Sequence, residues 1–156
     1  WMLDSQGGEQ ALIAASDAVS DFVVMAYRTD DFEIERIAGE WLDWGADNEF
    51  PIGVALENGP LSPEYVRTYR RSARGDLILD RSEPQAVVKM LGFPIEGSCT
   101  SPTYSFTQER EIEPARISFL NDRRALSKVR ERVTRNFAPW TSFKGLMIHG
   151  LITPGG

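Results

Sequence analysis

"FPIGVALEN", residues 50–58, contains an apolar run that stops abruptly at a carboxylate and an amide. The run 51–56 is nearly continuous rather than alternating with polar residues, which is typical of a strand buried on both faces of a parallel sheet. Three other segments share this character and are predicted strands: "FVVMAY" (22–27), "ARISFL" (115–120) and "GLMIH" (145–149). The chain therefore favours a sheet of buried parallel strands.

Helical patterns alternate with these strands. Apolar residues recur at spacings of three and four over 9–19, 32–45 and 123–137, and shorter helices are expected at 63–71 and 83–91. Such alternation indicates an α/β fold with parallel strands and right-handed crossovers. We expect a single α/β domain over 1–156, from which residues 92–114, rich in Gly, Pro, Ser and Thr, depart as a loop or hairpin.

Composition excludes several classes of protein. The chain has 156 residues, 42% of them hydrophobic, which suits a globular domain. Its net charge of −6 argues against a general binder of nucleic acid or anionic membrane, and no apolar run approaches a membrane span. Cys99 is the only cysteine, so neither an internal disulfide nor a thiolate metal site can form. No cofactor or metal is expected. Because the chain starts with Trp-Met, we expect a fragment or a processed product.

Polar side chains follow each predicted strand at its carboxyl end, where parallel α/β sheets bind their ligands. The opening "WMLD" reads as the end of one more strand. The residues at the strand ends are Trp1, Asp4, Tyr27, Arg28, Glu57, Asn58, Asp122 and His149.

Structural roles remain open for several of these residues. His149, the only histidine, is either a ligand-binding group or a core histidine. Arg28 is either a site residue or the ion-pair partner of a nearby aspartate, and Asp122 is either a catalyst or a helix cap. The basic residues at 67, 70, 71 and 74 form a solvated helix face or an anion site. Trp41 and Trp44 belong to the core or to an interface.

"SDFVVMAYRTD" (20–30), "FPIGVALEN", "ARISFLND" (115–122) and "SFKGLMIHGL" (142–151) together resemble the C-terminal half of a (β/α)8 barrel of the glycoside-hydrolase type. The resemblance is one of strand endings and covers most of the chain except 76–114. It implies a half or incomplete TIM-like barrel, since a complete barrel needs about 250 residues. A small open three-layer sandwich is the alternative architecture.

The resemblance also implies a function. Such enzymes use two carboxylates, and Glu57 and Asp4 match those positions. Trp1, Tyr27, Arg28, Asn58 and His149 would then bind the substrate. We expect a glycoside-hydrolase-like domain that binds or hydrolyses a polysaccharide, or alternatively a non-catalytic carbohydrate-binding or assembly module; whether it is an enzyme stays open.

Two further expectations follow from the same resemblance. Half a barrel exposes apolar strands and unpaired edges, so we expect a homodimer or a complementary chain that completes the barrel. A glycosidase of this kind is expected to be extracellular or periplasmic.

Overall fold

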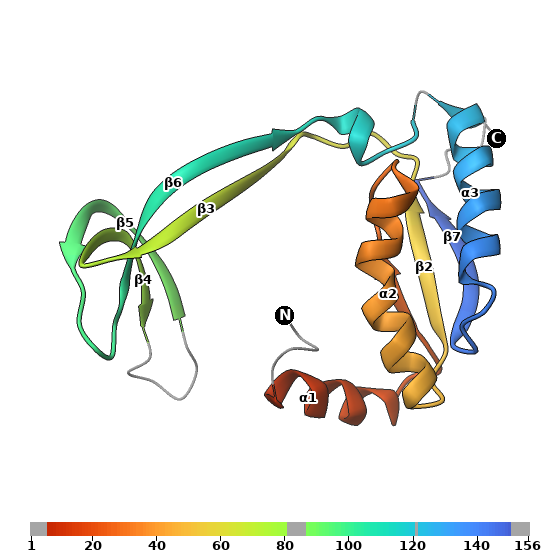
Figure 1. Cartoon of the computed structure of the whole chain (residues 1–156), viewed down its shortest axis with the longest axis horizontal. Helices are drawn as coiled ribbons and strands as arrows, with labels where there is room; N and C mark the ends of the chain where they lie inside the picture. The colour runs from red at the N-terminus through yellow and green to blue at the C-terminus, as the bar shows by residue number, and fades with distance from the viewer. Residues whose placement is uncertain (1–5, 81–86, 121, 151–156) are drawn as a thin grey trace. The chain divides into compact units, whose positions relative to one another are not determined.

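The computed structural model describes residues 6–80, 87–120 and 122–150. The chain divides into two compact units, one formed by residues up to Ser62 together with those from Glu113 onward, and the other by Pro63–Ile112. The first unit contains a three-stranded parallel sheet and the second a four-stranded antiparallel sheet (Figure 1). None of the helices among the described residues combines the length and apolar character needed to cross a bilayer.

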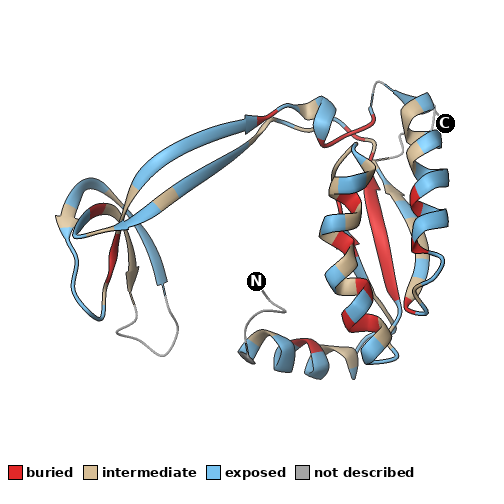
Figure 2. Ribbon diagram, viewed as in Figure 1, coloured by how far each residue is buried: buried red, intermediate tan, exposed pale blue. Residues whose placement is uncertain are grey.

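The first unit is built around the strand at its centre. Its sheet has the order β1 (Phe22–Met25), β2 (Ile52–Glu57) and β7 (Phe143–His149), with β2 parallel to both neighbours. All six residues of β2 are buried (Figure 2). The continuous apolar run in the sequence thus reflects a strand covered on both faces.

Helices α2 (Asp31–Asp47) and α3 (Arg123–Phe137) contribute the apolar layer beside the sheet. Asp30 caps α2 by accepting a hydrogen bond from the Glu33 N–H at 3.1 Å, and Asp122 caps α3 through the Ala125 N–H at 2.8 Å. The fully buried side chains come from spacings of about one turn on each helix: Ile34, Ala38 and Leu42 on α2, and Val133 and Phe137 on α3.

Polar contacts join the two helices. The Trp140 Nε1–H, just after α3, donates to Asp43 at 2.7 Å, and Arg132 forms an ion pair with Asp31.

Trp44 is 7% exposed and packs on Phe22, with ring centroids 5.8 Å apart. Helix α1 (Gln6–Ser16) adds Leu12 to the same core.

The opposite face of this sheet is partly open. Val23, Met25 and Met147 project from it and are 40%, 67% and 41% exposed. The centre of this face has little side-chain bulk, because β2 contributes Gly53 and Ala55 there. The strand alternation that places Met25 and Met147 on this face also places Tyr27, Glu57 and His149 on it.

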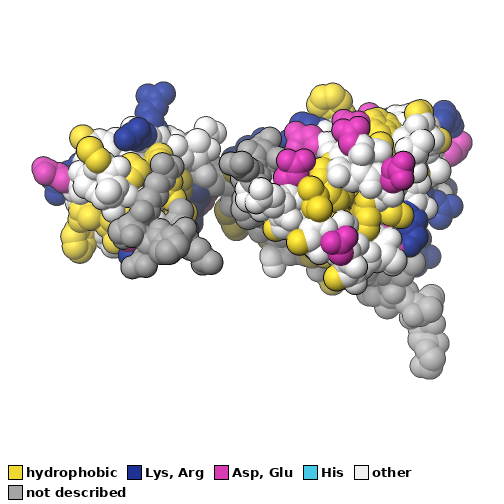
Figure 3. Space-filling view, turned by 90° about the horizontal axis from the view of Figure 1, so that it is seen from below, with side chains coloured by type: hydrophobic (Ala, Val, Ile, Leu, Met, Phe, Trp, Pro, Cys, Tyr) yellow, Lys and Arg dark blue, Asp and Glu magenta, His cyan; other side chains and the backbone are white. Residues whose placement is uncertain are grey.

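The second unit is an antiparallel sheet in the order β3 (Glu64–Ser72), β6 (Thr103–Ile112), β4 (Arg74–Asp80) and β5 (Val87–Glu96). Most of its side chains are exposed, and several of these are apolar (Figure 3). The exposed apolar residues include Tyr65, Val66, Val88, Met90, Phe93 and Phe106. The Tyr69 and Phe106 rings pack edge to face at 5.9 Å across the β3–β6 pair.

This architecture overturns the predicted half TIM barrel and the α/β class. The fold is a small α+β arrangement with a separate antiparallel sheet, and the parallel β/α alternation does not continue through the chain. The predicted strand 115–120 is wrong. Pro114 starts a 3₁₀ turn, η1 (Pro114–Arg116), and the Ile117 and Ser118 N–H groups bond back to the Pro114 carbonyl instead of joining a sheet.

The helix predicted at 63–71 is also wrong, because these residues form β3. Tyr, Val and Thr favour strands, and β3 pairs with β6 along its whole length. The helix predicted at 83–91 falls partly outside the described residues; its described part, from Val87, belongs to β5. Within residues 92–114, expected to be a loop or hairpin excursion, 92–96 form the end of β5 and 103–112 form β6.

Candidate functional site

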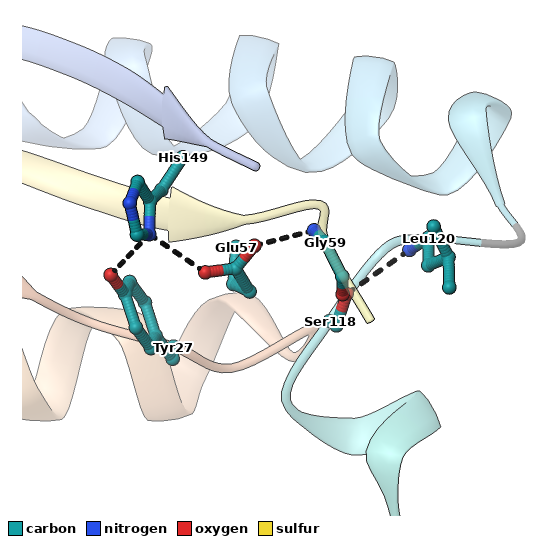
Figure 4. A network of polar contacts seen from close by, with 6 residues as sticks. All are labelled: Tyr27, Glu57, Gly59, Ser118, Leu120 and His149. Atoms are coloured by element: carbon teal, nitrogen blue, oxygen red, sulfur yellow. Dashed lines mark hydrogen bonds and ion pairs between the residues drawn. The ribbon is translucent and has the colours of Figure 1, made fainter. Parts of the chain in front are cut away.

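Glu57 is the centre of the site, at the carboxyl end of the β1–β2–β7 sheet. It is 3% exposed although it carries a carboxyl group. Its Oε1 accepts a hydrogen bond from the Gly59 N–H, and its Oε2 lies 2.9 Å from Nδ1 of His149 (Figure 4). Burying a carboxylate is costly unless its oxygens are hydrogen-bonded, and here both have a partner.

His149 ends β7, where the parallel register places it directly beside Glu57. Its side chain is 67% exposed while the Glu57 side chain is 4% exposed. The imidazole therefore turns one nitrogen, Nδ1, toward the buried carboxylate. The other nitrogen, Nε2, lies on the far side of the ring (Figure 4). A carboxylate that orients the imidazole of a histidine in this way is a common arrangement in binding and catalytic sites.

Tyr27 completes the group from the segment after β1. Its hydroxyl oxygen lies 2.8 Å from the same Nδ1 atom, and its ring is nearly parallel to the imidazole at a centroid distance of 5.9 Å. Burial, with a smaller contribution from the negative charge of Glu57, raises the pKa of Tyr27 above its ordinary value of 10.0. The phenol is therefore protonated at neutral pH.

Hydrogen bonds to two backbone carbonyls hold the loop next to this group. The Ser118 Oγ–H donates to the Gly59 carbonyl at 2.6 Å, and the Phe119 N–H donates to the Glu57 carbonyl at 2.9 Å. The segment 117–119 is thus buried because it braces the end of β2, although it forms no strand. Gly150 lies against Glu57 with a φ of 69°.

A cavity of about 370 Å³ lies between the segment 117–119 and the start of α3. It is mostly apolar. Among the described residues, Gly59 and Ser118 line both the cavity and the edge of the site, whereas Tyr27, Glu57 and His149 do not line the cavity. Its lining residues are Thr29, Gly59, Pro60, Leu61, Pro114, Ala115, Ser118, Phe119, Leu120, Asp122 and Ala125. The chemical groups of the site and this cavity are therefore neighbours and not one pocket.

The structure brings together three of the residues suggested by the sequence, namely Glu57, His149 and Tyr27. Asn58 contributes its N–H, which donates to the His149 carbonyl at 2.9 Å, while its buried Oδ1 has no hydrogen-bond partner among the described residues. The Arg28 Nη1–H donates to the Tyr27 carbonyl at 2.6 Å. Trp1 and Asp4 lie outside the described residues.

Sequence reasoning missed the supporting residues Gly59, Ser118 and Gly150. A glycine directly after "LEN" was a usable signal, because glycine lets backbone approach a neighbouring side chain closely. Ser118 gives no such signal, since its role depends on a loop in the segment 115–120, which the sequence predicts to be a strand. Within the described part of the chain, no group of His, Cys, Asp and Glu is arranged to hold a metal ion.

No protein-family model, no curated protein and no solved structure matches the chain.

Proposed function

We propose that the carboxyl end of the β1–β2–β7 sheet binds a carbohydrate, with His149 and Tyr27 contacting its hydroxyl groups. The observation that carries this proposal is the buried Glu57 carboxylate, which is hydrogen-bonded to a largely exposed imidazole. A buried carboxylate has little stabilising value in itself. Its position beneath His149 is explained if it orients that ring for a ligand.

Neighbouring apolar groups suit the same ligand class. Met25 and Met147 precede Tyr27 and His149 by two positions on the same sheet face, and both are exposed. Sugars present hydroxyl groups on their edges and C–H groups on their faces. A polar pair beside apolar side chains matches both kinds of surface.

Hydrolysis is the second candidate activity. Glycoside hydrolysis commonly requires two carboxyl groups, about 5 to 9.5 Å apart. Among the described residues, Glu57 is the carboxylate hydrogen-bonded within this site, and the proposed second carboxylate, Asp4, lies outside them. Binding is the first candidate because it needs no second carboxylate. The specific feature that favours turnover is the Glu57–His149 contact, since an oriented imidazole can transfer protons. The alternative of a non-catalytic assembly module is supported by the partly exposed apolar face of the β1–β2–β7 sheet.

The proposal is tested by titrating the chain with a panel of soluble oligosaccharides by calorimetry while assaying the same mixtures for new reducing ends. We expect binding by the wild type and about tenfold weaker binding by Tyr27→Phe, because one hydrogen bond to the ligand is lost. Tyr65→Phe, an exposed tyrosine of β3, is the matched control and should bind normally. Absence of binding across the panel, or equal binding by Tyr27→Phe, contradicts the proposal. New reducing ends would establish the second candidate.

A further inference from the structure

We infer that Glu57 sets the direction of the hydrogen bonds in the site, so that a ligand meets one acceptor, His149 Nε2, and one donor, the Tyr27 O–H. This pair selects the hydroxyl groups of an uncharged sugar over the carboxylate or phosphate of an acidic one. The assignment of the ligand rests on the proposed function; the assignment of the proton does not.

The first step concerns the proton on Nδ1 of His149. The Gly59 N–H can only donate, so it occupies Oε1 of Glu57 as an acceptor. Oε2 of the same carboxylate lies 2.9 Å from Nδ1. An ionised carboxylate has only lone pairs to offer, and two lone pairs facing one another at this distance repel. Nδ1 therefore carries the hydrogen and donates it to Glu57, which leaves Nε2 with the lone pair of the neutral ring.

The second step concerns Tyr27. Its oxygen lies 2.8 Å from the same Nδ1, which has one hydrogen and no lone pair left to accept with. The phenolic oxygen can therefore only accept a share of that hydrogen. Its own O–H must point away from His149, and because the pKa of Tyr27 is raised, the hydroxyl keeps its proton at neutral pH.

The third step concerns the ligand. An alcohol hydroxyl both donates and accepts, so it can give its hydrogen to Nε2 and receive the one from Tyr27. A carboxylate or a fully ionised phosphate group has no hydrogen to give to Nε2. It would also stand near the negative charge of Glu57, and like charges close together disfavour binding. The site accordingly discriminates by hydrogen-bond direction as well as by charge.

The proton assignment can be read directly because His149 is the only histidine in the chain. A long-range ¹H–¹⁵N spectrum of the full ¹⁵N-labelled chain shows one imidazole, and titration in the same spectrum identifies the pH at which it is neutral. There we expect the Nδ1–H tautomer. The opposite tautomer, with hydrogen on Nε2, would overturn the inference whatever the protein binds.

Glu57→Gln gives a sharper comparison. The carboxamide oxygen must stay opposite the Gly59 N–H, so the amide nitrogen turns toward His149 and donates to Nδ1. The tautomer should therefore invert to Nε2–H, whereas Tyr27→Phe, which leaves Glu57 in place, should keep Nδ1–H. An unchanged tautomer in folded Glu57→Gln counts against the inference. Should that variant not fold, the wild-type and Tyr27→Phe spectra still decide it.

Ligand selection is tested with each neutral oligosaccharide that binds and with its counterpart oxidised to a carboxylate at C6. We expect the oxidised form to bind at least about tenfold more weakly, measured by calorimetry at low salt, where charge effects are greatest. Equal or tighter binding of the oxidised form overturns the ligand assignment while the proposed carbohydrate function stands. If no sugar binds, the proposed function fails and the ligand assignment fails with it, but the tautomer spectra still report on the proton.

Discussion

Gly150 lies so close to Glu57 that a side chain at position 150 would collide with the carboxylate. A Cβ built on Gly150 meets Oε1 of Glu57 and the backbone of Gly59, and the φ of 69° is itself unfavourable for other residues. The backbone of Gly59 and Gly150 thus packs directly against the Glu57 carboxylate. A glycine is needed at both positions because a Cβ there would occupy the space next to the carboxylate.

Gly150→Ala should destabilise the first unit by about 1 to 3 kcal/mol, because alanine disfavours the left-handed backbone and its Cβ would collide with Glu57. Chemical denaturation followed by circular dichroism measures the change. The matched control is Gly39→Ala in α2, where a Cβ meets nothing within 4 Å. That substitution should stabilise the helix by about 0.5 to 1 kcal/mol. Equal effects of the two substitutions would show that the glycine at 150 is not required.

His149→Ala should lower stability by about 1 kcal/mol, because Oε2 of Glu57 loses its partner. This loss of stability is near the lower end of the range of about 1 to 3 kcal/mol for a buried polar group that loses its partner, because water can replace the exposed ring of His149. His149→Asn separates the two roles of this residue. Its amide can donate to Glu57 in place of Nδ1, so it should recover stability, but it lacks Nε2 and should not recover sugar binding. Denaturation and calorimetry on the same samples test both parts, and recovery of binding by the asparagine variant would refute the role of Nε2.

The contact between Asp31 and Arg132 should make stability depend on pH at the acid end. The hydrogen bond that Asp31 accepts from Arg132 lowers the pKa of Asp31 below 3.8 in the folded chain. The unfolded chain therefore takes up this proton first. The stabilisation is present above about pH 4 and is lost as the pH falls through the folded pKa.

Asp31→Asn should consequently be less stable than the wild type at pH 7, and the difference should shrink as the pH falls below 3.8. Urea denaturation at a series of pH values provides the measurement. Glu131→Gln is the control, because it removes a carboxylate whose side chain on α3 is 76% exposed. It should cost little at pH 7, as expected for surface pairs. A constant difference between Asp31→Asn and wild type at all pH values would contradict the prediction.

The second unit should be removable without loss of the first. The described residues that form the apolar core of the first unit all lie outside Pro63–Ile112. Glu64 and Ile112 are paired across β3 and β6, so the points where the chain enters and leaves the second unit are about 5 Å apart. A chain in which a Gly-Gly link replaces residues 63–112 should keep the near-ultraviolet circular dichroism of Trp44 and Trp140 and unfold cooperatively. Aggregation or loss of that signal would mean that the second unit stabilises the first.

The expected homodimer or complementary chain stays a prediction. The half barrel does not support it, because the fold is not a barrel. The open sheet face with Met25 and Met147 does support it, since exposed apolar surface favours association.

Local sequence determined the helices and the three strands of the first unit. Helix α3 was predicted over the residues it occupies, because its apolar spacing and the Asp122 cap both act within a few residues of each other. Strand β2 was equally plain, since a run of apolar residues between Pro51 and Glu57 has few alternatives to burial. Such signals can be read from sequence because the interactions behind them span less than about one helical turn or one strand.

Tertiary structure alone decided the rest. Tyr65, Val66 and Tyr69 became part of a strand through pairing with residues some forty positions away, as in the Arg67–Glu109 contact with its separation of 42. "ARISFL" was apolar enough for a strand but turns at Pro114 and braces Gly59. Sequence could name Glu57, His149 and Tyr27 separately. Their meeting at one nitrogen joins residues 92 and 122 positions apart, and only the parallel register of β1, β2 and β7 brings them together.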